Sequence, residues 1–355
     1  MSLHETRKIK IHQPENFQFD SIPDSHAWVD LHDHPTVEPV GPDTIPVIDL
    51  NDPKLVEKIG KACEEWGVFL ISNHGIEPKL LNQFCSQMHR LFALPADVKL
   101  KVAKADALDA GYGGDPISRF FPKYTWSEAF TILDSPLEHA KKLWPDDYSS
   151  FCEVMEEYKK AMNPLGRRLM HAMLLSLGVS EEEIINVTPM GDFGKIKTVL
   201  SLNSYPACPD ADRVLGLPPH SDNGFITFVY DNGVSGLQIL RRKDDNGPKR
   251  WVTVPVVPDT FVVNVGDLMQ VLTNGRFHNM VHRATIGKTY HRMSSAYFFA
   301  SELDVKVSPL SKLTDPGVGP LYKTVTWPEL LQMKNSLSYD EALEAIKIDS
   351  NLRGE

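Results

Sequence analysis

Two histidines and one aspartate, His220, Asp222 and His282, have the residue types and spacing of a metal site. In His220-Ser-Asp222 the two side chains are two residues apart, so a strand would point both into one cavity. His282 would supply a third ligand from a distant part of the chain. Two imidazoles and one carboxylate can hold Fe(II) by one face and leave three positions open, two for a chelating 2-oxo acid and one for dioxygen. The pattern therefore indicates iron-dependent oxygen chemistry.

A bare His-x-Asp pattern also arises by chance, so its value depends on its surroundings. His278 lies four residues before His282, could face the same side and is a rival for the third ligand position. Its alternative interpretation is a histidine at the rim or on the surface. His74, His89 and His171 have no acidic partner at ligand spacing, and we predict that they are structural or exposed.

Arg292 and Ser294 are also two residues apart and lie on one face of a predicted strand. Gly287-Lys288 predicts a hairpin turn between this strand and His282, which would bring the guanidinium near the metal. A guanidinium binds a carboxylate bidentately and keeps its charge when desolvated, so it suits the far carboxylate of 2-oxoglutarate. Tyr205 could contact the same carboxylate from a neighbouring strand. The alternative for Arg292 is a surface charge.

The first half of the chain is predicted to form a mainly helical part that supports the β core carrying these groups. Residues 45–50 and 67–75 resemble short strands, each followed by an amphipathic helix. Asp52-Pro53 predicts the start of the first helix. A longer helix is expected over residues 149–177, bent or weakened in its middle by proline and glycine.

The second half has a different character, because short β-prone segments are separated by Gly, Pro and Asn. This pattern predicts a sandwich or barrel, followed by a returning helix at residues 327–348. The predicted strands cover residues 197–202, 225–230, 237–240, 251–256 and 261–265.

Composition narrows the class of protein. At 355 residues, 42% hydrophobic and 24% charged, the chain can bury a large core. A net charge of −10 argues against binding to nucleic acid or acidic membranes. The four cysteines show no CxxC spacing and are expected to be free thiols of a reducing compartment. We see no leader or membrane span and expect a cytoplasmic monomer that binds a small molecule, with nuclear entry left open.

With these residues in place, the chain resembles the plant 2-oxoglutarate/Fe(II)-dependent dioxygenases from residue 45 to the C-terminal helix. The resemblance is carried by these segments: Ile45-Pro-Val-Ile-Asp-Leu50, Ala62-Cys-Glu-Glu-Trp-Gly-Val-Phe69, Asn73-His-Gly75, Asn203-Ser-Tyr-Pro-Ala-Cys208, His220-Ser-Asp222, Asn274-Gly-Arg-Phe277, His282-Arg283 and Arg292-Met-Ser294. It implies Fe(II), 2-oxoglutarate and dioxygen, with ascorbate as reductant. It also favours His282 over His278 as the third ligand, and Arg292, Ser294 and Tyr205 as the co-substrate site.

The resemblance further implies an α+β fold with a double-stranded β-helix (jelly-roll) core and supporting N-terminal and C-terminal helices. The domains would be an N-terminal wrapping segment at 1–44, an N-terminal helical/β domain at 45–190, the jelly-roll catalytic domain at 191–305 and a C-terminal helical extension at 306–355.

Several stretches look closest to the gibberellin 3-oxidase branch, among them Ile22-Pro-Asp-Ser-His-Ala-Trp28, Trp126-Ser-Glu-Ala-Phe-Thr-Ile132 and Leu321-Tyr-Lys-Thr-Val-Thr-Trp327. The implied reaction is hydroxylation, or desaturation, of an unactivated C–H bond, with the 3-beta position of a gibberellin as the expected target. An acidic gibberellin needs a cation in the pocket, and Arg119 and Lys123 are the nearest candidates to Phe120-Phe121, although a surface role fits each better.

The chain departs from the branch in three places. Ser221, Asn223 and Gly224 stand in the segment that is usually His-Thr-Asp-Ser-Thr, Ala129 replaces a glycine, and Ala300-Ser301 replaces Gly-Pro. The metal chemistry should survive these changes, whereas recognition of the substrate could differ. A recruited dioxygenase of specialised metabolism that acts on an alkaloid or another terpenoid is therefore an alternative. Two alternatives of other classes are a non-catalytic small-molecule binder that kept the fold and an iron oxidase that needs no 2-oxo acid.

Overall fold

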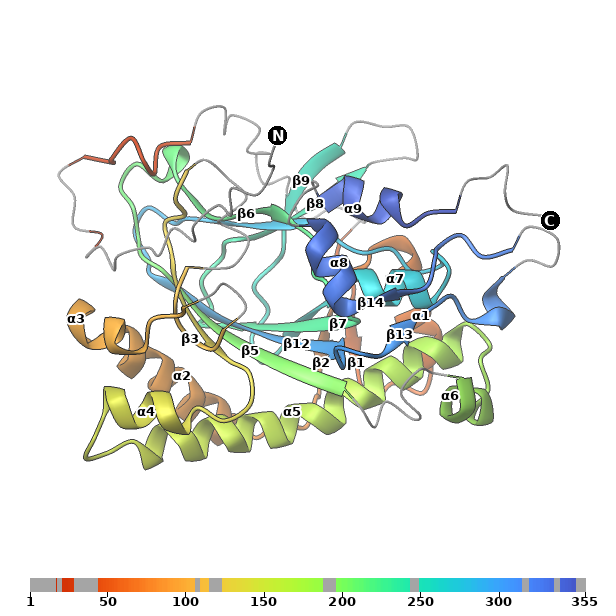
Figure 1. The fold of residues 1–355 in the computed structure, drawn as a ribbon, viewed down its shortest axis with the longest axis horizontal. Coiled ribbons are helices and arrows are strands. Elements are labelled where there is room, and N and C mark those ends of the chain that lie inside the picture. The colour runs from red at the N-terminus through yellow and green to blue at the C-terminus, as the bar shows by residue number, and fades with distance from the viewer. Residues whose placement is uncertain are drawn as a thin grey trace, which may run out of the picture.

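Two β-sheets form the centre of the molecule in the computed structural model, which describes residues 17, 21–28, 44–105, 109–114, 123–187, 196–242, 249–314, 319–334 and 339–348. The larger sheet has the spatial order β1 (Val47–Asp49), β2 (Val68–Ser72), β10 (Phe261–Val265), β7 (Ile226–Asp231), β12 (Arg292–Ser301), β5 (Ile196–Tyr205), β4 (Glu128–Ile132) and β3 (Gly111–Gly113). The smaller sheet has the order β6 (Leu215–His220), β11 (His282–Thr285), β8 (Leu237–Arg242) and β9 (Lys249–Thr253). The two sheets form the expected jelly-roll core (Figure 1).

The two faces of the larger sheet are set by strand alternation. Phe130 pairs with Leu202, and Leu200 pairs with Tyr297; all four pack in the main hydrophobic cluster beneath the helices. The alternate residues therefore face the smaller sheet. At one end of this inner space, Val68, Val229 and Val262 of the larger sheet pack with side chains of β8. The inner face is apolar there and polar along β5 and β12.

Helices cover the outer face of the larger sheet, and the colours of Figure 1 show α5 running along its length. The helices of the first half are α1 (Leu55–Glu65), α2 (Pro78–Phe92), α3 (Ala96–Lys99), α4 (Leu137–Leu143), α5 (Ser149–Ser176) and α6 (Glu181–Val187), with a 3-10 turn at Leu100–Val102. The predicted start of the first helix was two residues too early. Asp52 accepts a hydrogen bond from Lys54 N at 2.8 Å, and the helix begins at Leu55.

Helix α5 continues without a break through Pro164, so the expected weakening of its middle did not interrupt it. Gly166 faces the sheet, where an added Cβ would lie 2.1 Å from Cζ of Phe299. The Phe299 ring is buried beside Tyr297 and Phe228 and has little space to move away. The glycine at this position therefore allows α5 to lie directly on β12.

We expect Gly166→Ala to destabilise the protein by about 1–3 kcal/mol, because it overpacks a filled core. Urea unfolding followed by far-UV circular dichroism measures this free energy. Arg167→Ala, at an exposed position of the same helix, is the control and should change it by less than about 0.5 kcal/mol. Equal stability of the two variants would contradict the packing argument.

The C-terminal part contains two short helices where one was predicted, α8 (Trp327–Lys334) and α9 (Tyr339–Ala345), with residues 335–338 outside the described residues. The remaining elements are α7 (Asp267–Leu272), which was not predicted, β13 (Lys306–Val307), β14 (Val325–Thr326) and 3-10 turns at Ala211–Arg213 and Ser311–Leu313. Helix α7 directly follows β10. It forms where the sequence suggested only the end of a β run.

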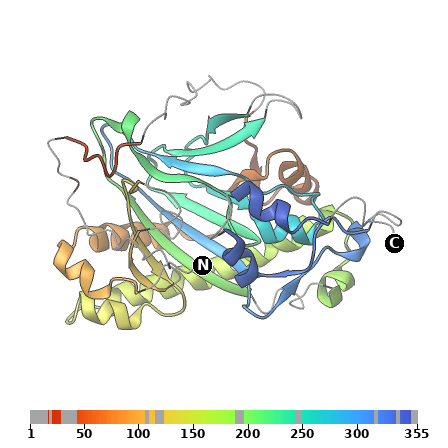
Figure 2. The same ribbon diagram turned by 45° about the horizontal axis from the view of Figure 1, so that its top comes forward.

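The strands that carry His282 and Arg292 do not form the predicted hairpin. β11 pairs with β6 and β8 in the smaller sheet, whereas β12 pairs with β5 and β7 in the larger one. The turned view in Figure 2 shows the two strands in separate layers. The two sites therefore face each other across the roll.

The described part of the N-terminal segment lies against the body of the protein. Trp28 N donates to Arg213 O at 2.9 Å, and Tyr124 N donates to Ser25 O at 2.8 Å. Phe17 packs edge-on against Trp126, with ring centroids 5.0 Å apart. The rest of the predicted wrapping segment lies outside the described residues.

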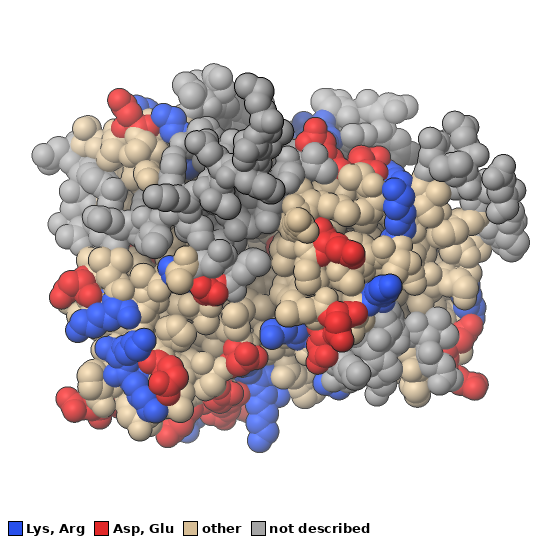
Figure 3. Space-filling model, viewed as in Figure 1, with Lys and Arg blue, Asp and Glu red and all other residues tan. Residues whose placement is uncertain are grey.

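The surface and the thiols fit the compositional picture. On the face seen in Figure 3, acidic and basic side chains are interspersed. Among the described residues, no helix is long and apolar enough to cross a membrane. Cys63, Cys85, Cys152 and Cys208 are all free, as predicted.

Candidate metal centre

The structure brings His220, Asp222 and His282 together. Their ligand atoms lie within 4.8 Å of one another, and all three residues are buried. Asp222 Oδ1 is 3.8 Å from His220 Nε2 and 3.7 Å from His282 Nε2. His220 ends β6 and pairs directly with His282 at the start of β11. Asp222 lies beyond the end of β6, so the loop, and not strand alternation as predicted, turns it toward the imidazoles.

Backbone carbonyls orient both imidazoles. The Nδ1 of His220 lies 2.8 Å from Pro218 O, and the Nδ1 of His282 lies 3.0 Å from Met280 O. Because each Nδ1–H donates to a carbonyl, each Nε2 keeps a lone pair that points toward Asp222. Two histidines are thus held in the tautomer that a metal requires.

The carboxylate of Asp222 shows the need for a cation. Its Oδ2 is buried and accepts no hydrogen bond from the described residues. A buried carboxylate oxygen is costly unless something satisfies it. A divalent metal ion bound by Asp222 and the two Nε2 atoms would do so, and the donor set of two nitrogens and one oxygen fits Fe(II).

The protonation states of His220 and Asp222 also suit metal binding. Burial and the neighbouring His282 imidazole lower the pKa of His220 to about 3. Burial opposes ionisation of Asp222, but the imidazoles of His282 and His220 outweigh it and hold the pKa of this carboxyl below its usual range. A neutral imidazole and an ionised carboxylate are the forms that bind metal.

The rival histidines lie elsewhere. His278 is exposed, four residues from the buried His282. His74 accepts a hydrogen bond from Ile76 N at 3.1 Å, and His171 lies 3.1 Å from Glu181. His89 is exposed on α2. Within the described residues, the cluster of His220, Asp222 and His282 is the one found with metal-binding geometry.

The predicted co-substrate residues also come together, on the inner face of the larger sheet. Arg292 pairs with Tyr205 in the register of β12 and β5, and its guanidinium lies 5.2 Å from the centre of the Tyr205 ring. Its Nη1 donates to Ser294 Oγ at 3.2 Å. Arg292 is 2% exposed, which rules out the alternative of a surface charge.

Two glycines on the side of the smaller sheet, Gly216 and Gly236, leave room for these side chains. An added Cβ at Gly216 of β6 would lie 2.6 Å from the Tyr205 ring, and one at Gly236 would lie 2.8 Å from Cδ of Arg292. The Arg292 guanidinium also donates to Val234 O at 3.2 Å and contacts Asp231 at 3.4 Å. Within the described residues, three of its five N–H groups are used, so donors remain for a carboxylate.

A network of hydrogen bonds and an ion pair, which was not predicted, supports residues 220–222, the metal loop. Asp267 N donates to Asp222 O at 2.8 Å, and the fully buried carboxylate of Asp267 accepts a bond from Asn279 Nδ2 at 2.6 Å. Lys334, at the end of α8, forms an ion pair with the same carboxylate. Its ammonium also donates to Ser221 O at 2.9 Å and Ser221 Oγ at 2.8 Å. Helix α8 thus stabilises the segment between two predicted ligands.

Lys334→Met should therefore destabilise the protein by about 3–5 kcal/mol, because it leaves the Asp267 carboxylate buried without its cation. Urea unfolding of the metal-free protein measures this loss. Lys312→Met is the control, since Lys312 forms an exposed ion pair with Glu183, and it should leave the unfolding midpoint unchanged. A similar midpoint for both variants would contradict a structural role for Lys334.

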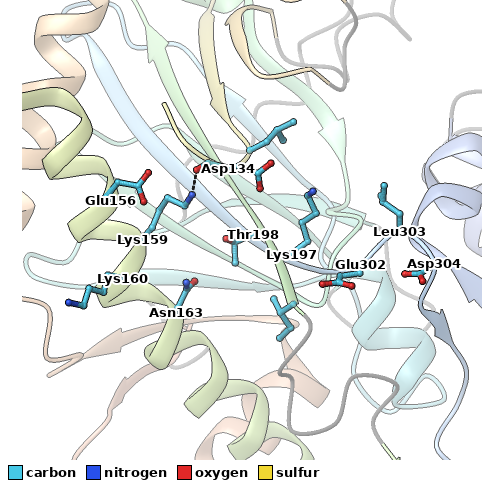
Figure 4. Close-up of a pocket in the computed structure, with 12 residues that line it drawn as sticks. Asp134, Glu156, Lys159, Lys160, Asn163, Lys197, Thr198, Glu302, Leu303 and Asp304 are labelled. Atoms are coloured by element: carbon cyan, nitrogen blue, oxygen red, sulfur yellow. Dashed lines mark hydrogen bonds between the residues drawn. The ribbon is translucent and has the colours of Figure 1, made fainter. Parts of the chain in front are cut away.

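A cleft of about 700 Å³ lies on the other side of the larger sheet. Figure 4 shows that Lys159 of α5 reaches across it to the carbonyl of Asp134, while Glu302 and Asp304 lie at its far end. Both charge signs line it, and none of its lining residues belongs to the predicted metal or co-substrate sites. We conclude that it is separate from the metal centre.

Comparisons with known proteins agree with this geometry. Residues 196–301 match the 2OG-Fe(II) oxygenase superfamily, and residues 45–147 match the N-terminal region of non-haem dioxygenases in morphine synthesis. In a structural comparison, the JOX2 complex with 2OG, Fe and JA aligns with a TM-score of 0.79 and 28% identity over 94% of this chain and 95% of that one. The rice dioxygenase for auxin oxidation aligns with a TM-score of 0.69 and 27% identity over 86% and 100%.

The chain belongs to the 2OG-Fe(II) oxygenase superfamily and is an oxidoreductase that uses Fe(II) and 2-oxoglutarate. Among its relatives, gibberellin 3-beta-dioxygenase 2 of Arabidopsis thaliana is 41% identical over 93% of this chain and 93% of its own length. Gibberellin 3-beta-dioxygenase 1 of Pisum sativum is 39% identical over 96% and 91%.

Proposed function

We propose that His220, Asp222 and His282 hold the iron, and that Arg292, Ser294 and Tyr205 bind the far carboxylate of 2-oxoglutarate. The support for the first set is the convergence of three buried ligand atoms on one centre. The support for the second is a buried guanidinium with unused donors on the inner face of the larger sheet. When bound, iron couples oxidation of a C–H bond by dioxygen to the conversion of 2-oxoglutarate into succinate and carbon dioxide.

The protein residues contribute position and exclusion of water. Pro218 O and Met280 O fix the imidazole rings, so that the open face of the centre has one orientation. Arg292 anchors one end of the co-substrate, which leaves its 2-oxo acid end to reach the metal. The inner space is lined by buried side chains, which keep bulk water from the reacting carbon.

We further propose that the substrate is a gibberellin and that the product is hydroxylated at its 3-beta position. The observation that carries this proposal is the identity of 39–41% with gibberellin 3-beta-dioxygenases over nearly the whole chain. The test is an assay of the iron-loaded enzyme with a panel of gibberellins, with and without 2-oxoglutarate, analysed by mass spectrometry. A product 16 mass units heavier, formed only with 2-oxoglutarate, is expected; no turnover of any gibberellin would contradict the proposal.

A second candidate is a dioxygenase of specialised metabolism that acts on an alkaloid or another terpenoid. It is favoured by Ala129, which pairs with Asn203 and so lies on the inner face, where a side chain can meet substrate. Adding alkaloids and other terpenoids to the same panel distinguishes the two candidates. A non-catalytic binder would bind a member of the panel without consuming 2-oxoglutarate.

We propose that the enzyme is a cytoplasmic monomer. We also propose that its domains have the boundaries predicted from the sequence, at 1–44, 45–190, 191–305 and 306–355. The net charge of −10 and the interspersed surface charges support the absence of a nucleic-acid or membrane partner. Light scattering after size-exclusion chromatography should give a mass near 39.9 kDa. A mass of twice this value would contradict the monomer.

A further inference from the structure

Two buried polar side chains near the metal centre have no part in the sites described above. They are Thr227 of β7, which is 1% exposed, and Asn264 of β10, which is fully buried. Among the described residues, neither the Oγ1 of Thr227 nor either polar atom of the Asn264 amide has a partner with hydrogen-bond geometry. A buried polar group without a partner is costly, so the presence of two such groups in one place requires an explanation.

The register of the larger sheet places these two side chains next to each other on its inner face. Thr227 pairs directly with Asn264, and the neighbouring pair of Phe228 and Val263 packs in the main hydrophobic cluster beneath the helices. Strand alternation therefore turns Thr227 and Asn264 toward the smaller sheet. Residues directly opposite each other on antiparallel strands have Cβ atoms about 4.5–5.5 Å apart, so an amide and a hydroxyl can form a hydrogen bond there.

The same pair lies at the end of the sheet that carries the metal loop. An added Cβ at Gly266, two residues after Asn264, would lie 3.1 Å from Asp222 O. Burial opposes ionisation of Asp222, but the two imidazoles of the centre and then the Thr227 hydroxyl hold the pKa of this carboxyl below its usual range. Thr227 is therefore close to the carboxylate, and Asn264 lies on the far side of Thr227.

The hydrogen-bonding capacities of the three side chains are complementary. Asp222 Oδ1 lies 3.8 Å from His220 Nε2 and 3.7 Å from His282 Nε2, so it is the oxygen that faces the metal. Oδ2 remains as an acceptor without a donor. A hydroxyl can donate one hydrogen bond while it accepts another, and an amide has two N–H donors. Asn264, Thr227 and Asp222 can thus satisfy one another in series.

We propose that Thr227 and Asn264 are positioning residues for Asp222: the Asn264 amide donates to Thr227 Oγ1, and the Thr227 hydroxyl donates to Asp222 Oδ2. The inference rests on the proposed function, because it assigns residues to the proposed metal centre. The metal supplies the charge that the carboxylate needs, and the hydroxyl fixes the orientation of the carboxylate. With Oδ2 held in this way, Asp222 binds iron through Oδ1 alone and leaves three positions open.

The test measures the affinity for Fe(II) by anaerobic equilibrium dialysis. Thr227→Val replaces the hydroxyl by a methyl group of similar shape and should lower the affinity about 10- to 100-fold, the range for loss of an outer partner of a metal ligand. Thr227→Ser keeps the hydroxyl and should stay near the wild type. Asn264→Leu should lower the affinity about 2- to 10-fold, the range of one neutral hydrogen bond.

A double variant tests the serial arrangement. If Asn264 acts only through the Thr227 hydroxyl, Asn264→Leu should have no further effect on iron affinity once Thr227→Val is present. Effects of the two substitutions that simply multiply would contradict the series.

Urea unfolding of the metal-free protein separates positioning from a role in folding. The groups removed by Thr227→Val and Asn264→Leu have no partner with hydrogen-bond geometry among the described residues, so the unfolding midpoint should stay unchanged or rise. Ser295→Ala is the matched control, because it removes another buried hydroxyl of the larger sheet. Ser295 pairs with Leu202, which packs beneath the helices, so its hydroxyl lies on the outer face and its loss should leave iron affinity unchanged.

The outcomes separate the inference from the proposed function. A wild-type protein that binds no iron contradicts the proposed metal centre. If the wild type binds iron and Thr227→Val binds it equally well, the positioning role is contradicted and the metal centre stands. A urea midpoint that falls together with iron affinity in both variants would show a role in folding instead. A raised KM for 2-oxoglutarate with unchanged iron affinity would place the hydroxyl against the co-substrate and would also contradict the inference. Asn264→Leu tests the pair independently if Thr227→Val does not fold.

Discussion

Asp222→Ala is expected to abolish turnover and to lower the affinity for iron by about 100-fold or more. The change removes the one anionic ligand of the centre, and the loss should exceed the 10- to 100-fold effect of altering an outer partner of a metal ligand. It leaves two buried imidazoles that cannot neutralise a divalent ion. Equilibrium dialysis against Fe(II), with iron measured by mass spectrometry, gives the affinity. Product formation gives the activity.

His278→Ala is the matched control, because it removes an imidazole four residues from His282 that is exposed in the structure. It should bind iron with a stoichiometry of one and turn over at the wild-type rate. His282→Ala should lose iron affinity and turnover, as Asp222→Ala does. If His278→Ala lost iron and His282→Ala kept it, the assignment of the third ligand would be reversed.

Arg292→Leu is expected to raise the KM for 2-oxoglutarate by about 100-fold while the iron content stays near that of the wild type. The substitution removes a buried bidentate partner of a carboxylate, worth about 1.5–3 kcal/mol or somewhat more, and each 1.4 kcal/mol is a factor of ten. Steady-state kinetics with varied 2-oxoglutarate measures the effect. Dialysis against Fe(II) tests the metal site separately.

Two further variants refine this result. Arg292→Lys keeps the charge but loses the planar guanidinium fork. Its KM for 2-oxoglutarate should lie between those of Arg292→Leu and the wild type. Arg276→Leu removes an exposed guanidinium that pairs with Glu64 and should leave the KM unchanged. A wild-type KM for 2-oxoglutarate in Arg292→Leu would show that the co-substrate binds elsewhere.

Local sequence patterns predicted several of the helices and strands and the class of chemistry. Apolar periodicity predicted α1, α2 and α5, because the apolar face of each is buried in the main hydrophobic cluster. The residue types of His220, Asp222 and His282 predicted a metal site before any fold was known. The pairing register of β6 and β11 then places His220 directly opposite His282.

The contacts between distant segments could not be predicted in the same way. Gly287-Lys288 suggests a hairpin, yet β11 and β12 enter different sheets, a choice made by long-range pairing that a local turn signal does not contain. Asp267 and Lys334 are 67 residues apart in sequence (334 − 267) and meet only through the docking of α8.

The ion pair of Lys334 has a consequence for biosynthesis. All three proposed metal ligands lie before residue 283, whereas the ammonium that neutralises Asp267 belongs to Lys334. During translation, the ribosome therefore releases a complete ligand set before the group that stabilises its loop has been made. A product truncated ahead of α8 would carry every proposed ligand and still lack this support.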